Sequence, residues 1–173
     1  MAEVVQDMSE QRAETPRATA PAAPGIQYDQ TAYPDSATLS PAERLILWIV
    51  RSLAEDPGNW SLIQRELWLR CGPARIEAVL QSLHEMLTTL VLHRRRVLSV
   101  RKPTSPRVSA DEVTMLSLIA AAQAQQACKL DALARWLVRQ QGHDLLMTQA
   151  TEFARGLLAA GIALTQTASA DSE

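Results

Sequence analysis

Aromatic side chains are scarce in this chain of 173 residues, which has one Phe, two Tyr and four Trp, or 4% aromatic residues. Because 47% of the residues are nevertheless hydrophobic, Leu and Ala must supply most of a packed core. Both have high helix propensities, whereas strands favour β-branched and aromatic side chains. The composition therefore predicts an all-α fold in which helices pack on helices.

Cysteines are also few, and long apolar runs are lacking. The two cysteines, Cys71 and Cys128, form no CxxC pair, and we expect two free thiols in a reducing compartment. No run approaches the ~20 apolar residues of a spanning helix. Glu3, Asp7 and Glu10 near the start do not fit a signal peptide. We therefore expect a cytoplasmic protein with no membrane partner.

Recognisable catalytic and ligand-binding motifs are missing as well. There is no glycine-rich phosphate loop, no GxSxG or HExxH motif and no Cys/His cluster at metal-ligand spacing. Glu77 and His84 fit an ordinary polar helix face better than a metal site. In the His143-Asp144 pair, Asp144 fits the first turn of a helix, where negative charge is favourable. We therefore predict a protein that is not an enzyme and that holds no cofactor or metal.

Apolar residues recur at helical spacing in six segments. The first two helices are expected to break at Asp56-Pro57-Gly58-Asn59 and at Cys71-Gly72-Pro73, and the fifth is expected to stop near Gly142. The six segments lie over residues 41–55, 60–70, 76–91, 113–124, 130–138 and 145–158.

The two halves of the chain open alike. Ser40 with Glu43, and Ser109 with Glu112, have the spacing of a capping box, in which the two residues satisfy each other's backbone N–H groups at a helix start. Each box precedes a long, a short and a long helical pattern. We therefore expect two similar three-helix halves, explained either by internal duplication or by chance alignment of two Leu-rich segments.

These patterns divide the chain into five parts. We predict a disordered N-terminal arm over residues 1–39, a first half over 40–102, a Pro-containing connector over 103–108, a second half over 109–164 and a disordered tail over 165–173.

Negative charge is absent between Met86 and Ala110, although the whole chain carries a net charge of −2. We call residues 94–107 the basic segment. Three interpretations are open: the arginines solvate a helix end and pair with carboxylates such as Glu77 or Glu85, they dock an acidic protein or a small anion, or they contact nucleic-acid phosphates. The basic side chains are those of Arg94, Arg95, Arg96, Arg101, Lys102 and Arg107.

Together these features favour a regulatory or adaptor protein that binds another protein. Arg94, Arg95, Arg96, Arg101 and Lys102 are the predicted electrostatic contacts. Trp60 and Trp68 are the predicted apolar anchors. The first helix is apolar nearly all round, which also allows a homodimer.

The alternative is a regulator that binds DNA or RNA. The first half has the order of elements of a helix-turn-helix with a basic stretch behind it. Against this alternative, no Asn-Gly or Asp-Gly turn divides residues 91–102 into the hairpin that a wing requires.

Overall fold

The computed structural model describes residues 34–164, and within them six helices and two short 3-10 turns form with no strand. The all-α prediction is therefore confirmed. The helices are α1 (Pro41–Glu55), α2 (Trp60–Cys71), α3 (Ile76–His93), α4 (Ala110–Gln123), α5 (Ala127–Leu137) and α6 (Gln140–Ala159), and the turns are η1 (Ser36–Thr38) and η2 (Pro57–Asn59).

The predicted arm and tail fall mostly outside this range. Residues 1–33 and 165–173 are not among the described residues. Residues 34–39 are described: η1 lies beside the basic segment, where Ser36 N donates to Pro106 O at 2.6 Å and Val108 N donates to Pro34 O at 3.2 Å. These backbone hydrogen bonds hold the residues that precede α1 in place.

Both predicted capping boxes are present. Ser40 and Ser109 each accept a hydrogen bond from the backbone N–H of the Glu three residues later, and each Glu accepts one from the Ser N–H. Pro41 occupies the first position of α1, where its missing N–H costs nothing.

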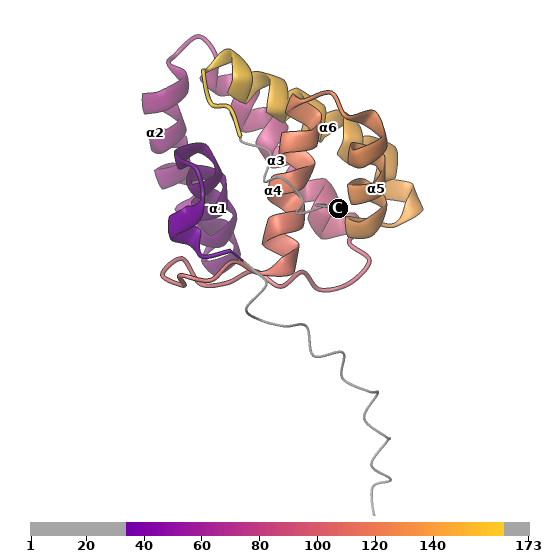
Figure 1. The fold of residues 1–173 in the computed structure, drawn as a ribbon. Helices are drawn as coiled ribbons and strands as arrows, with labels where there is room; N and C mark the ends of the chain where they lie inside the picture. The colour runs from indigo at the N-terminus through magenta and orange to yellow at the C-terminus, as the bar shows by residue number, and fades with distance from the viewer. Residues whose placement is uncertain (1–33, 165–173) are drawn as a thin grey trace, which may run out of the picture. The chain divides into compact units, whose positions relative to one another are not determined.

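Helices α3 and α6 pack along their lengths and form the most extensive helix pair. They run antiparallel, because Gly142 of α6 lies against His93 at the end of α3 while Gly156 lies against Val79 near its start. Helix α4 packs on α5, α6 and α1. Figure 1 shows α4 near the centre of the view, with α1 and α2 on one side and α5 on the other, while α6 runs across the top of the view.

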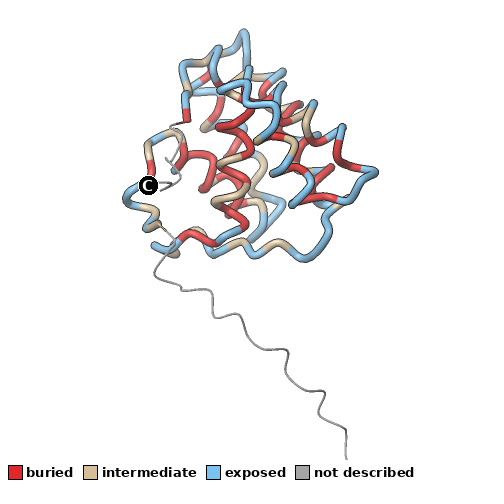
Figure 2. Tube along the Cα trace, turned by 45° about the vertical axis from the view of Figure 1, so that its right-hand side comes forward, coloured by how far each residue is buried: buried red, intermediate tan, exposed pale blue. Residues whose placement is uncertain are grey.

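One hydrophobic core runs through residues 40–102 and 109–164 (Figure 2). Ile46 and Ile49 from α1 are fully buried, as is Phe153 from α6. Much of the apolar surface of α1 is therefore covered within the chain, and a homodimer through this helix stays a prediction. The order long, short, long occurs twice, but internal duplication is not confirmed.

Gly142 was predicted to separate the last two helices, and this is wrong. Helix α5 ends at Leu137, α6 begins at Gln140, and Gly142 lies inside α6. The glycine is required by packing, since a Cβ at this position would lie 2.3 Å from His93 Cβ. The break falls instead at Arg139, whose N–H donates to His93 O at 2.8 Å.

The two cysteines are free thiols, as predicted, with Cys71 buried and Cys128 exposed. Among residues 34–164, no helix combines the length and the apolar character needed to cross a membrane.

Candidate functional site

The basic segment is fixed to the helices by one buried guanidinium. Arg51 of α1 is 2% exposed. Its Nε and Nη2 donate to the two carboxylate oxygens of Glu112 at 2.8 and 3.0 Å. Its Nη1 donates to Ser105 O at 2.7 Å, and Nη2 also donates to Arg107 O at 2.8 Å. One side chain thus joins α1, the basic segment and the start of α4.

Glu112 is the matching acceptor. Burial alone would raise the pKa of this carboxyl, but hydrogen bonds from Arg51, from the Ser109 N–H and from the Arg101 N–H together hold its pKa below the ordinary value. The Arg101 N–H lies 2.9 Å from Glu112 Oε1. The charged form is therefore the one that the fold stabilises.

Arg96 pairs with Asp111 of α4. One of the three interpretations of the sequence has the arginines pair with carboxylates and names Glu77 and Glu85 of α3 as examples. Both Nη atoms of Arg96 donate to the Asp111 carboxylate, at 2.7 and 2.5 Å. The guanidinium also lies 5.6 Å from the ring centroid of Trp136. Burial would raise the pKa of Asp111, but these bonds and one from the Ser99 N–H lower it overall.

Arg95 is likewise engaged in the fold. Its Nε donates to Val138 O at 2.8 Å, and its backbone N–H donates to Leu137 O at 3.1 Å. These bonds attach the start of the basic segment to the end of α5. Of the five basic residues predicted to contact a partner, Arg95 and Arg96 therefore hold parts of the chain together.

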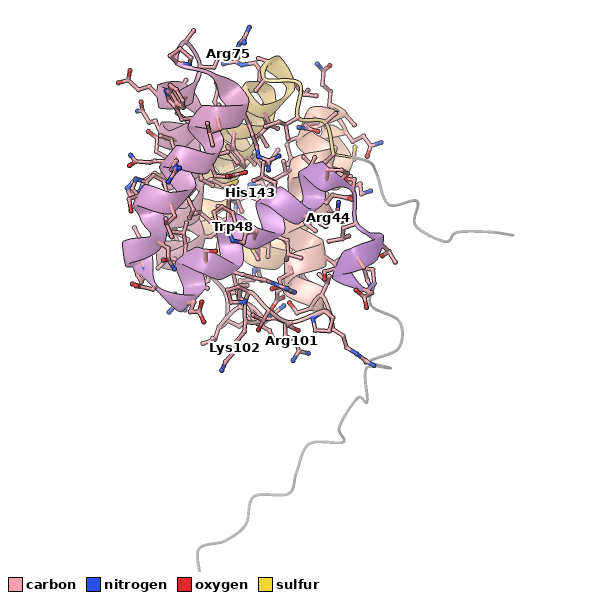
Figure 3. All side chains as sticks on the ribbon, turned by 90° about the vertical axis from the view of Figure 1, so that its left-hand side faces the viewer. Arg44, Trp48, Arg75, Arg101, Lys102 and His143 are labelled. Carbon is pink, nitrogen blue, oxygen red and sulfur yellow. The ribbon has the colours of Figure 1, made fainter. Side chains whose placement is uncertain are left out.

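The other three present their charge outward. Arg94 is exposed and donates to Val91 O in the last turn of α3 at 3.2 Å. The exposed side chains of Arg101 and Lys102 form no hydrogen bond or ion pair with residues 34–164. Figure 3 shows both at the outer edge of the molecule, directed away from the helices.

Two adjoining hollows form an apolar groove beside these charges. One, of about 400 Å³, lies between η2 and α3 and includes Trp60 and Leu92. The other, of about 300 Å³, lies between the end of α1, the end of α3 and the basic segment and includes Val97. Both hollows are lined by Leu53, Leu87 and Val91. We call the two neighbouring hollows together the apolar groove.

The floor and rim of the groove expose large aliphatic side chains. Val91 is 60% exposed, Leu92 is 70% exposed and Val97 is 81% exposed. Arg94 lines the end of the groove that faces the basic segment. A surface of this kind can cover the apolar side chains of another molecule.

The two predicted tryptophan anchors lie in different places. Trp60 lines the groove, and its ring meets the His84 ring edge-on with centroids 5.7 Å apart. Trp68 is 50% exposed on α2 and lines neither hollow. The aliphatic residues of the groove were not predicted as a site, because at helical spacing they are indistinguishable from core residues.

His143 and Asp144 lie inside α6, in the first two turns. His143 is buried; its Nδ1 lies 2.8 Å from Asp144 Oδ1 and its Nε2 lies 3.1 Å from Asp131 Oδ1. The sequence predicted Asp144 in the first turn of a helix, and this is wrong. Helix α6 starts at Gln140, so Asp144 lies in its second turn. Within residues 34–164 no three His, Cys, Asp or Glu side chains are grouped so that they could hold a metal ion.

Comparison of the chain with protein-family models, with curated proteins and with solved structures finds no match.

Proposed function

We propose that this protein is a non-catalytic regulatory or adaptor protein of the cytoplasm that binds another protein through the apolar groove. The observation that carries the proposal is the exposure of Val91, Leu92 and Val97 in two hollows that share three lining residues. Contiguous exposed apolar surface next to polar residues is typical of protein interaction sites. The half-buried Trp60 at one end is the kind of residue that anchors such an interface.

The energy available in the groove suits a reversible interaction. Covering one Val or Leu side chain completely contributes about 1.5–3 kcal/mol, less for the partly exposed side chains here. Association itself costs several kcal/mol of lost freedom, so two or three such contacts must act together. Outward charges on Arg94, Arg101 and Lys102 add electrostatic attraction at the groove's edge.

Nucleic-acid binding is the alternative, and the geometry favours it less. Arg95 and Arg96 are committed to Val138 O and to Asp111. The remaining three predicted basic contacts, Arg94, Arg101 and Lys102, supply few phosphate contacts, whereas affinity for nucleic acid rises with the number of phosphates neutralised.

The test is capture of partners by the tagged full-length chain from a native lysate treated with nuclease. Val91→Glu places a charge in the centre of the groove at a site that is already exposed. Leu158→Glu is the matched control, since Leu158 is exposed on α6 and lines no part of the groove. We expect a discrete protein to be captured by the wild type and by L158E and lost with V91E.

Cross-linking locates the contact. Lys102 and Lys129 are the two lysines of the chain, and they lie beside the groove and on α5. An amine-reactive cross-linker should join the captured protein to Lys102 and not to Lys129. Equal capture by V91E, or links through Lys129 alone, would contradict the groove as the binding site. Material that disappears with nuclease would instead support the nucleic-acid alternative.

A further inference from the structure

We infer that the groove's occupant is an amphipathic helix of about three turns, with its acidic residues over the basic segment. This inference rests on the proposed function and specifies the chemistry of the partner. Three features of the groove support this inference: its length along α3, the hydrogen bonding of the backbone N–H groups beside it and the distribution of charge at its two ends.

The length of the groove matches about three helical turns. Its lining runs from His84 on α3 to Arg94, the residue directly after the helix. Nine helical steps of about 1.5 Å and one extended step make this stretch about 16 Å long. A partner helix lying along it would therefore present about ten residues, with apolar side chains at spacings of three and four covering Leu87, Val91 and Leu92.

Part of the backbone beside the groove is already bonded within the chain and is closed to an extended peptide. Residues 34–164 form no strand, and key N–H groups of the basic segment are already bonded within the chain. The Arg95 N–H donates to Leu137 O, the Ser99 N–H to Asp111 and the Arg101 N–H to Glu112. An extended segment laid on aliphatic side chains would leave its own polar groups unpaired, whereas a helix satisfies them internally.

The charges at the two ends of the groove differ in sign. Arg94 lines one end, and Arg101 and Lys102 follow directly after Val100, which lines it too. No carboxylate occurs between Met86 and Ala110 to offset them. At the other end, the exposed Asp56 directly precedes Pro57 of the groove. Complementarity therefore favours a helix whose acidic residues lie toward the basic segment.

A displayed library of random peptides tests this without knowledge of the natural partner. Peptides of about sixteen residues are long enough to cover the groove as a helix. They are selected on the full chain and counter-selected on V91E. We expect enriched peptides to have apolar residues at spacings of three and four together with Glu or Asp, and to gain helical circular dichroism on binding.

Charge reversal of a selected peptide isolates the electrostatic contribution to its affinity for the groove. Changing its acidic residues to Lys should weaken binding about 3- to 10-fold, as expected for two or three exposed ion pairs. The double variant R101S/K102S should reduce the difference in affinity between the original and the charge-reversed peptide. R135S on α5 should leave this difference unchanged. Binding measured by fluorescence anisotropy should also weaken with added salt.

Two outcomes would overturn the inference. Groove-dependent peptides that are extended, or that prefer basic residues, would refute the acidic helix while leaving protein binding by the groove intact. A selection that yields no peptide distinguishing the wild type from V91E would also refute it. In that case capture and cross-linking from the lysate still decide the proposed function separately.

Discussion

At the scale of single residues, Arg51 places a full positive charge in the interior and has it matched by Glu112 and by two backbone carbonyls. Such a buried pair contributes little net stability compared with an apolar replacement, because desolvation offsets the attraction. Removing one partner is different, since it leaves the other charge buried and uncompensated. What the pair provides here is position: it fixes the path of the basic segment from Arg101 to Arg107.

Glu112→Gln should therefore destabilise the protein by about 3–5 kcal/mol near neutral pH. The pKa of Glu112 is lowered on folding from an ordinary value of 4.5. Its contribution is thus fully present above about pH 4.5 and is lost as the pH falls through the lower folded value. Urea unfolding between about pH 3 and pH 7 should show a shallower loss of stability on acidification in E112Q than in the wild type.

Glu85→Gln on the exposed side of α3 is the control, since among residues 34–164 Glu85 accepts only from Gln81 in its own helix. This variant should follow the wild-type pH profile. An E112Q profile parallel to that of the wild type would show that Glu112 titrates alike in the folded and unfolded states, contrary to its hydrogen bonding.

At the scale of elements, the two helix starts at Ser40 and Ser109 allow a matched comparison. Each hydroxyl accepts from the N–H of a Glu, but the Ser109 hydroxyl also donates to Ser99 O. Ser40→Ala should cost about 1 kcal/mol, the usual value of an N-cap. Ser109→Ala should cost about 1–3 kcal/mol more, because it also leaves the Ser99 carbonyl without its donor. Thermal or urea unfolding of both variants measures the difference, and equal losses would refute a second role for Ser109.

The elements themselves were largely predictable from the sequence, because their signals are local. Capping boxes and apolar spacing located the starts of α1 and α4 and the six helices in order. Gly142 was assigned wrongly for the opposite reason: its role depends on His93, which lies far away in sequence. A glycine needed for close helix packing looks, in sequence, like one that ends a helix.

The candidate site was predictable only in part. Trp60 and Arg94 were predicted and do border the groove, but the sequence gives equal weight to Trp68, Arg95 and Arg96. The groove is assembled from the end of α1, from α3 and from the basic segment. Which arginine stays free is decided by distant partners such as Asp111 and Val138, and no local pattern contains that information.

At the scale of the whole molecule, the shared core predicts that residues 34–164 unfold as one cooperative unit. Helix α3 from the first half packs along α6 from the second, and Arg51 of α1 is bound to Glu112 of α4. Neither half can lose its structure without exposing the buried face of the other. Unfolding followed by helical circular dichroism and by tryptophan fluorescence should therefore give coincident transitions, since three tryptophans lie in the first half and Trp136 lies in the second.

Separated halves provide the complementary test. A chain of residues 34–102 lacks the partners of α3 and Arg51, and one of residues 103–164 leaves the α3-facing side of α6 uncovered. Each should show weak, non-cooperative helicity alone, and mixing the two should restore a cooperative transition if the interface suffices to hold them together. Cooperative unfolding of either half by itself, or two separate transitions in the intact chain, would show two independent three-helix domains. The Arg51–Glu112 pair would then be a contact between domains, not part of a common core.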